Sequence, residues 1–134
     1  MVPHNDPTPS PATAPSVLVV EDEVLVRTNV AEYLRACGYR VLEANDADEA
    51  ILILRNVDDI DIVFTDVQMP GSLDGFGLAQ WVRRERPRIR VIITSGVARV
   101  SKDAAELCQE GPLLAKPYDH RELDRRIRWL LATR

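Results

Sequence analysis

The chain has 134 residues, of which 46% are hydrophobic, and a formal net charge of −4 at pH 7. This length and composition fit one soluble domain with a single core. No apolar run approaches the roughly 18 residues of a membrane span, and no basic flank with a long apolar segment opens the chain, so membrane insertion and a secretory signal are not expected. Two cysteines far apart in sequence, Cys37 and Cys108, favour reduced thiols and a cytoplasmic protein over disulfides or a zinc site.

Two stretches have an unusual composition. Residues 1–15 contain five prolines and almost no large apolar side chain, and such a segment buries too little surface to offset its ordering entropy. We therefore predict a disordered tail at residues 1–15 and a folded domain at residues 16–134. The arginine-rich stretch Arg83–Arg90 has no interleaved aromatic side chains, so we interpret it as a solvated helix end and expect no nucleic-acid partner.

Strand and helix patterns alternate along the rest of the chain. Short apolar runs bounded by turn residues predict five buried strands, at Val17–Val20, Arg40–Ala44, Ile62–Phe64, Arg90–Thr94 and Leu113–Ala115. Apolar residues at helical spacing predict a helix after each run. The first helix runs from Val24 to a stop at Gly38, and the second begins at an N-cap at Asn45. The third runs from about Gly75 to before Pro87, and the fourth covers Val100–Cys108. The fifth begins at a capping box of Asp119 and Glu122. The alternation predicts an α/β fold with a mainly parallel sheet.

Polar groups that can do chemistry stand where these strands end. Glu21 and Asp22 follow the first strand, Asp66 ends the third, and Ser95 and Lys116 follow the fourth and the fifth. The second strand ends without such a residue. Because ligands bind beyond the carboxyl ends of parallel strands, we expect these side chains to share one pocket, with the second strand at an edge of a sheet of order 2-1-3-4-5.

This grouping predicts a site for a metal ion and a phosphoryl group. Carboxylates brought together repel unless a cation pairs with them, and Mg²⁺ accepts one or two carboxylates while leaving room for waters or phosphate oxygens. Asp66 is the expected nucleophile towards phosphorus, with Mg²⁺ and Lys116 neutralising the phosphoryl oxygens. Ser95 offers a hydroxyl donor and Gly96 a backbone amide to those oxygens.

Four short motifs occupy these strand ends. They are VVEDE at Val19–Glu23, TDVQMP followed by DG at Asp74–Gly75, IITSG at Ile92–Gly96, and AKPY at Ala115–Tyr118. Together, over about residues 16–133, they resemble the receiver domain of bacterial two-component response regulators. The resemblance implies a flavodoxin-like three-layer sandwich, with a five-stranded parallel sheet of order 2-1-3-4-5 and five helices. It also implies that a sensor histidine kinase or a phosphotransfer protein phosphorylates Asp66 in the presence of Mg²⁺.

The resemblance also implies roles for single residues. Metal contacts are implied for Asp22, Asp66 and the main-chain carbonyl of Gln68, and for Glu21 through a water molecule. Ser95 is expected to turn towards the phosphoryl group as a switch residue, and the peptide bond from Lys116 to Pro117 is expected to be cis.

Three positions depart from the common receiver pattern. Leu113 stands at the switch position where receivers often have an aromatic residue. Ser72 lengthens the loop after Asp66, and Tyr118 replaces the usual phenylalanine.

We interpret the chain as a stand-alone, phosphoryl-accepting signalling switch, and not as an enzyme with an external product. Its output is expected to be a contact with an unknown downstream protein, through the face of the fourth helix, fifth strand and fifth helix, and a weak homodimer is left open. Two alternatives within the family are an interaction module that works without phosphorylation, which Leu113 keeps open, and a phosphate sink.

Two other classes fit less well. A phosphatase of the haloacid-dehalogenase type needs an acid two residues after its nucleophile, where this chain has Gln68. A flavin-binding module on the same fold needs a Ser/Thr/Gly loop after the first strand to hold phosphate, where this chain has acids at Glu21–Glu23. His120 is expected to be exposed to solvent, and the pattern does not separate packing from partner-facing roles for Trp81 and Trp129.

Overall fold

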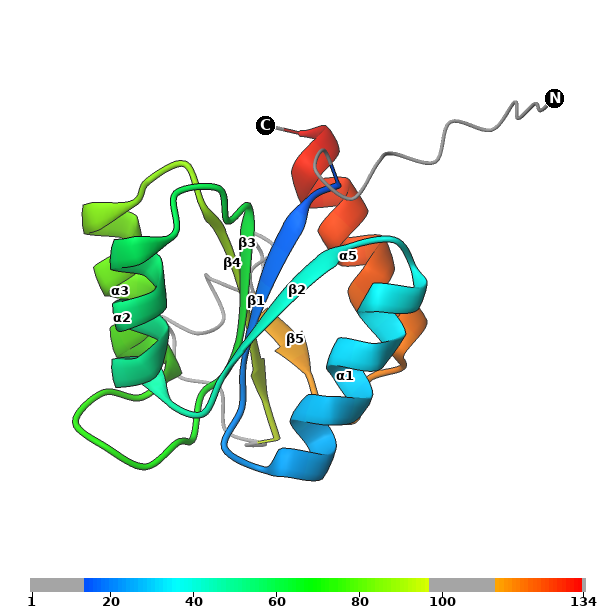
Figure 1. The fold of residues 1–134 in the computed structure, drawn as a ribbon. Helices are drawn as coiled ribbons and strands as arrows, with labels where there is room; N and C mark the ends of the chain where they lie inside the picture. Colours follow the sequence, from blue (N-terminus) through cyan, green and yellow to red (C-terminus); the bar gives the residue numbers. More distant parts are fainter. Residues whose placement is uncertain (1–13, 97–112, 134) are drawn as a thin grey trace, which may run out of the picture.

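The computed structural model describes residues 14–96 and 113–133 (Figure 1). Along the chain these residues form β1 Ser16–Val20, α1 Val24–Ala36, β2 Arg40–Ala44, α2 Ala47–Asn56, β3 Ile62–Asp66, α3 Gly75–Glu85, β4 Arg90–Ser95, β5 Leu113–Ala115 and α5 His120–Ala132. The predicted fourth helix, over Val100–Cys108, and the first 13 residues of the predicted tail lie outside the described residues. No helix in the described ranges has the length and apolar character needed to cross a membrane.

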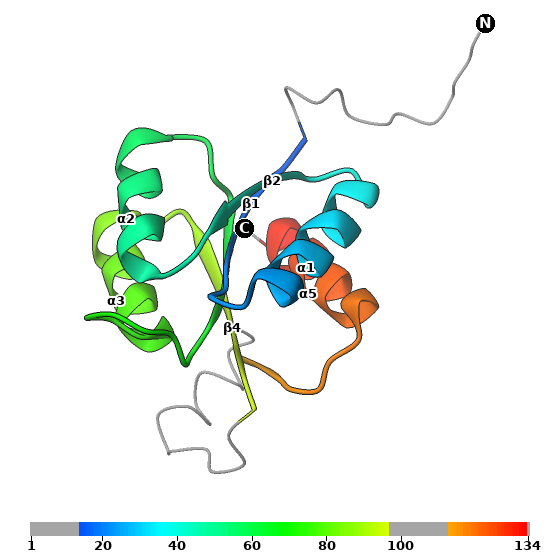
Figure 2. The same cartoon turned by 60° about the horizontal axis from the view of Figure 1, so that its bottom comes forward.

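All five strands run parallel in one sheet of order β2-β1-β3-β4-β5, which confirms the predicted fold class and strand order. Helices α1 and α5 cover one face of the sheet, and α2 and α3 cover the other (Figures 1 and 2). The result is the expected three-layer flavodoxin-like sandwich, with four of the five expected helices in the described ranges. β2 lies at an edge, as predicted from its lack of a chemically useful residue.

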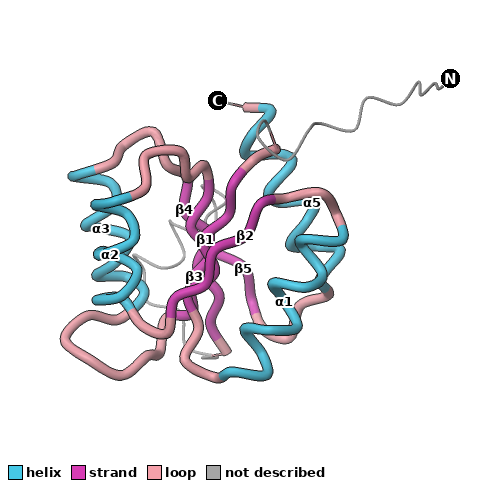
Figure 3. Tube along the Cα trace, in the orientation of Figure 1, coloured by secondary structure: helices cyan, strands magenta, loops and turns pink. Residues whose placement is uncertain are grey.

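The sheet lies between two layers of helices (Figure 3), and the described core consists of one large apolar cluster on each face of the sheet and a smaller third cluster of Val67, Ile93 and Leu113 on the α3 side. Successive side chains of β1 point to opposite faces, so Val17 and Val19 join the cluster under α1 and α5, whereas Leu18 and Val20 join the cluster under α2 and α3. Burial on both faces explains why β1 is a continuous apolar run instead of an alternating one. These clusters hold the strands in register, and therefore fix where each strand ends.

Helix α2 begins one residue later than predicted. The side chain of Asp46 accepts a 2.9 Å hydrogen bond from the backbone N–H of Glu49, which makes Asp46 the N-cap. Asn45, the predicted cap, lies just outside the helix and donates its own N–H to the Glu49 carboxylate at 2.7 Å. Both residue types can cap a helix, and Asp46 has the extended backbone conformation of a residue that precedes the first turn.

Other predicted boundaries are confirmed. Gly38 stops α1 with a φ of 102°, a value that glycine adopts without penalty. Asp119 and Glu122 form the predicted capping box at the start of α5. The two tryptophans differ: Trp81 packs inward from α3 and is 9% exposed, whereas Trp129 on α5 is 53% exposed.

Candidate functional site

An aspartate and a lysine from different strands meet at the carboxyl edge of the sheet. Asp66 is the last residue of β3, and Lys116 follows the last residue of β5. The Lys116 Nζ donates a 2.9 Å hydrogen bond to Asp66 Oδ2, although β4 separates the two strands. The Asp66 residue is only 9% exposed, so its carboxylate depends on this partner for charge compensation.

Two further acids lie beside Asp66. Glu21 and Asp22 follow β1, which is the neighbour of β3 in the sheet, and their carboxylate oxygens lie within 4.8 Å of each other and of an Asp66 oxygen. Burial raises the pKa of Glu21 to about 7, with a further upward contribution from the negative charge of Asp66, while a hydrogen bond from the Glu23 backbone opposes the shift. Such a group of acids is unfavourable without a cation.

The donor set fits the predicted Mg²⁺ ion. All side-chain donors in this group are carboxylate oxygens, the ligand type that Mg²⁺ prefers. Neither histidine nor cysteine belongs to the group among the described residues. The geometry therefore brings together the three acids that were predicted as metal ligands.

The other predicted site residues lie at the same edge. The backbone N–H of Gln68 donates to Asp66 Oδ1 at 3.3 Å, and the carbonyl of Ser95 accepts from the Lys116 N–H at 3.0 Å. A Cβ built on Gly96 would lie 3.7 Å from the Lys116 side chain, so this glycine is in contact range of the lysine. Their proposed roles in binding a metal ion or a phosphoryl group remain predictions.

The three departures from the receiver pattern have different surroundings. Leu113 is 7% exposed and packs with Val67 and Ile93. Ser72 lies in the loop between β3 and α3 and donates a 3.3 Å hydrogen bond to Asp48 in the first turn of α2. Tyr118 packs edge-on against the Phe64 ring on β3, with centroids 5.8 Å apart. The Lys116–Pro117 peptide bond is cis, as predicted.

Gly75 supports the site for a reason that the sequence did not show. Its N–H donates to the carbonyl of Val67 at 2.8 Å, which brings the start of α3 against the end of β3. A Cβ at this position would collide with the carbonyl oxygen of Asp66 and lie 2.8 Å from the Val67 Cα. The DG dipeptide was recognised as part of a motif, but the close approach itself depends on the position of a different element.

Arg27 was also missed by the sequence analysis. From α1 its guanidinium donates to the carbonyl of Glu21 at 2.9 Å, to the Glu43 carboxylate at 3.3 Å and to Asn45 Oδ1 at 3.2 Å. The side chain thus ties the acidic loop after β1 to the end of β2. An arginine on the polar side of a helix carries no signal in sequence that distinguishes it from a solvated one.

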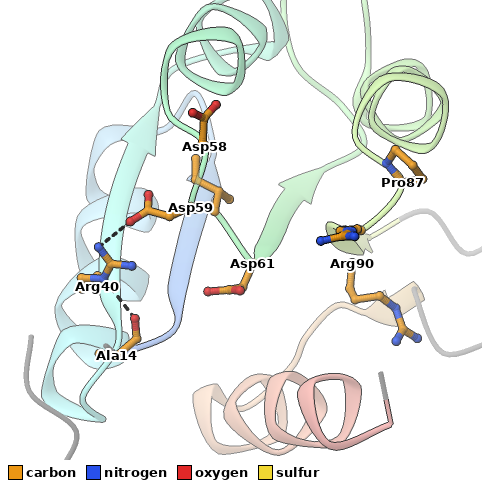
Figure 4. A pocket seen from close by; sticks show the side chains of 9 residues that line it. Ala14, Arg40, Asp58, Asp59, Asp61, Pro87 and Arg90 are labelled. Atoms are coloured by element: carbon orange, nitrogen blue, oxygen red, sulfur yellow. Dashed lines mark hydrogen bonds and ion pairs between the residues drawn. The ribbon is translucent and has the colours of Figure 1, made fainter. Parts of the chain in front are cut away.

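A second group of charges lies at the opposite end of the sheet (Figure 4). It lines a hollow of about 720 Å³ formed by Ala14, Arg40, Asp58, Asp59, Ile60, Asp61, Pro87, Arg88 and Arg90. Arg40 pairs with Asp59 at 2.8 Å, Asp61 accepts the N–H of Ser16 at 2.9 Å, and Arg90 donates to a backbone carbonyl of α5 at 3.3 Å. These bonds attach strand starts to neighbouring segments, so the hollow has a structural explanation.

The fold and the strand-end site together define a class of protein: a parallel α/β domain whose carboxyl edge joins an aspartate, a lysine and two further acids. Residues 17–128 match the response regulator receiver domain family, and the chain belongs to this family. Members of this family are regulatory signalling domains of two-component systems rather than enzymes in the usual sense. Receiver domains bind Mg²⁺ at an acidic cluster.

Three relatives illustrate the match. The probable transcriptional regulator ycf27 of Cyanophora paradoxa is 34% identical over 116 residues, 86% of this chain and 47% of that protein. The solved receiver protein of Pseudomonas putida is 30% identical with a TM-score of 0.76, over 87% of this chain and 97% of that one. Response regulator TrrA of Thermotoga maritima, solved in complex with Mg²⁺ and BeF, is 24% identical with a TM-score of 0.75, over 87% of this chain and 98% of that one, and shows the shared fold.

The chain spans about half the length of the curated relatives it matches. The first of these is named a probable transcriptional regulator, so the expectation of no nucleic-acid partner, which was based on the lack of aromatic residues around Arg83–Arg90, is not supported. The expectation of a stand-alone protein stays a prediction.

Proposed function

We propose that this receiver domain is a phosphoryl-accepting signalling switch and that Asp66 carries the phosphoryl group. The observation that supports this most directly is the hydrogen bond between Lys116 and Asp66, beside the two acids that follow β1. An aspartate that only opens a turn needs neither a lysine from a distant strand nor further acids at the same edge. Such a combination is expected at a phosphoryl-transfer site, where charge must be held and neutralised.

The transfer step follows from these positions. A carboxylate oxygen of Asp66 forms a bond to the phosphorus of a phosphohistidine donor while the bond between phosphorus and the imidazole nitrogen breaks. The imidazole keeps the electron pair of that bond and takes up a proton, and Asp66 becomes an acyl phosphate. Lys116 holds the carboxylate before transfer and neutralises charge on the phosphoryl oxygens afterwards. Ser95 and Gly96, next to Lys116, are the proposed donors to the remaining oxygens.

The proposed cofactor is Mg²⁺. Glu21, Asp22, Asp66 and the main-chain carbonyl of Gln68 are its proposed ligands, and the ion supplies positive charge for the phosphoryl oxygens when it is bound. The close approach of the three carboxylates and the raised pKa of Glu21 support this assignment. The complex of TrrA with Mg²⁺ and BeF supports it by analogy.

The proposed partners follow from this chemistry. A sensor histidine kinase or a phosphotransfer protein supplies the phosphoryl group in the cytoplasm, and a downstream protein responds to the phosphorylated state. Leu113 favours one second candidate, an interaction module that works without phosphorylation, because residue 113 itself carries no aromatic ring that could change its position. A phosphate sink requires the same chemistry at Asp66 without a downstream target.

The test is labelling of the purified chain with radioactive acetyl phosphate and Mg²⁺, followed by peptide mapping. The parent is expected to be labelled, and Asp66→Asn is expected to lose the label because an amide is not a nucleophile towards phosphorus. Asp59→Asn is the matched control: Asp59 lies at the far end of the sheet, paired with Arg40, and this variant should be labelled like the parent. Stoichiometric labelling of Asp66→Asn would refute the assignment, and an unlabelled parent would favour the interaction module.

A further inference from the structure

A row of rings connects the candidate site to the first helix. Phe64 lies two residues before Asp66 on β3, and the Tyr118 ring packs against it at 5.8 Å with an interplanar angle of 85°. The Tyr118 ring lies 6.2 Å from the His120 ring, and the His120 ring lies 5.1 Å from that of Tyr33 on α1. Each ring thus contacts the next one, so the row is a defined packing unit.

Tyr118 is connected to the site in two ways. It follows Lys116 by two residues in the short connection between β5 and α5, and Lys116 is bound directly to Asp66. The pKa of Tyr118 is raised to about 12, mainly by burial and further by the negative charges of Glu21 and Asp66. The ring is therefore close enough to the acids to respond to their charge. A change of charge at Asp66 therefore acts on Tyr118 both through the chain and through space.

Phosphorylation changes both of these connections. The charged carboxylate of Asp66 becomes a neutral acyl group, and the negative charge moves to phosphoryl oxygens farther from the strand. The Lys116 ammonium follows that charge, because a cation that is two-thirds buried loses stability without an anionic partner. The loop that carries Lys116 also carries Tyr118, so the contact between Tyr118 and Phe64 changes with it.

The opposite face of the sheet offers no comparable route among the described residues. Leu113 packs there with Val67 and Ile93, and Phe76 packs against this cluster, but no ring-to-ring contact is present on that face among the described residues. Leu114, by contrast, joins the cluster that contains Phe64, with Tyr118 packed against it. The row of contacting rings therefore lies on the side of the sheet that α1 and α5 cover.

We infer that Tyr118 changes position when Asp66 is phosphorylated, and that its ring contact with His120, followed by the contact of His120 with Tyr33, carries this change to the surface between α1 and α5. This inference rests on the proposed function of Asp66. It assigns the response of the domain to a residue where the chain departs from the receiver pattern. It also gives a role to His120, which is half-buried between two tyrosine rings and not exposed to solvent as predicted.

The test uses NMR of the intact chain with Mg²⁺ and beryllofluoride, a tetrahedral analogue of the phosphoryl group. Bound fluoride is detected by its ¹⁹F signal, and the imidazole signals report on the ring row. The chain has only two histidines, His4 and His120, so His4 gives an internal reference. In the parent, the His120 signals are expected to shift when beryllofluoride binds.

Three variants test whether the shift of the His120 signals depends on the ring row. Tyr118→Leu is expected to bind beryllofluoride but to lose most of the His120 shift, because the intermediate ring is gone. Tyr118→Phe keeps the ring and removes only the hydroxyl, so it should fold like the parent and keep most of the shift. Trp129→Leu is the matched control, because it removes an exposed ring from α5 outside the row and should leave the shift unchanged.

The outcomes distinguish this inference from the proposed function. Bound beryllofluoride with unmoved His120 signals in the parent would overturn the inference alone. A full His120 shift in Tyr118→Leu, or its loss in Trp129→Leu, would overturn it as well. Failure of the parent to bind beryllofluoride and to accept label from acetyl phosphate would overturn the proposed function, and the inference with it.

Discussion

The Lys116 ammonium lies 2.9 Å from Asp66 Oδ2, although the two residues are 50 positions apart in sequence. The lysine side chain is 33% exposed and the aspartate side chain 11% exposed, so the pair is too buried to be treated as a surface ion pair of negligible strength. Removal of the lysine would leave a carboxylate next to two other acids without its cation. The pair therefore sets the resting charge balance of the site.

Lys116→Ala is expected to keep Mg²⁺ binding but to lose the conformational response to phosphorylation. The three acids remain in place, and the cation that competes with the metal ion is gone, so calorimetry should show an affinity for Mg²⁺ no weaker than that of the parent. Amide chemical shifts should change less on phosphorylation than in the parent, because the group that follows the phosphoryl charge is missing. Arg121→Ala, which removes an exposed cation from α5, is the control. An unaltered amide response in Lys116→Ala would contradict the role assigned to this lysine.

Gly75→Ala is expected to destabilise the fold. The new Cβ would overlap the backbone of β3 at Asp66, so the strand end or the start of α3 must move, and overpacking of this kind costs about 1–3 kcal/mol. Urea unfolding measures the difference. Gly96→Ala is the matched control, since its Cβ would meet only ordinary contacts with the Lys116 side chain. Equal free energies of unfolding for the two variants would show that the backbone around Gly75 has room for a Cβ.

Arg27→Met tests whether Arg27 positions the acids. Methionine keeps an apolar stem but removes the donors to Glu21, Glu43 and Asn45. Loss of a residue that orients metal ligands typically weakens metal affinity by roughly tenfold or more, and calorimetric titration with Mg²⁺ should show a loss of this order. Arg35→Met is a close control, because Arg35 also pairs with Glu43 but donates to the Val41 carbonyl instead of the acidic loop. Similar Mg²⁺ affinities for both variants would contradict the positioning role.

The metal-free domain is expected to lose stability as the pH rises from about 4.5 to 7. The pKa of Glu21 is raised from 4.5 to about 7, mainly by burial. In that range the folded state holds a proton that the unfolded chain has released, so the unfolded state binds fewer protons and the free energy of unfolding falls with rising pH. Glu21→Gln cannot release a proton and should have a flatter profile.

Urea unfolding at several pH values, with a chelator present, measures this dependence. Glu23→Gln changes an exposed acid in the same loop and serves as the control, with a profile expected to follow that of the parent. Parallel profiles for the parent and Glu21→Gln would show that Glu21 does not titrate as its burial indicates.

Several features of the fold follow from local sequence patterns. Continuous apolar runs such as Val17–Val20 require a strand covered on both faces, and the Asp119 and Glu122 pair marks a helix start by bonds within a single turn. The same reasoning failed by one residue at α2, because Asn45 and Asp46 are both suitable caps and only the path of the backbone decides between them. The two tryptophans were left undecided for a similar reason, since each lies on an amphipathic helix and its orientation depends on the packing angle of that helix.

The sequence by itself determined which residues end the strands, because strand ends are set by short-range apolar patterns and turn chemistry. It thereby predicted the acids and the lysine of the site, and the motifs around them indicated the family. Only the tertiary structure decided which groups from other elements hold that site: the contact of Gly75 with the Asp66 carbonyl, the reach of Arg27 to the acidic loop, and the ring row from Phe64 to Tyr33. These contacts join segments that are distant in sequence, so they depend on how the helices pack on the sheet, and no local pattern encodes that packing.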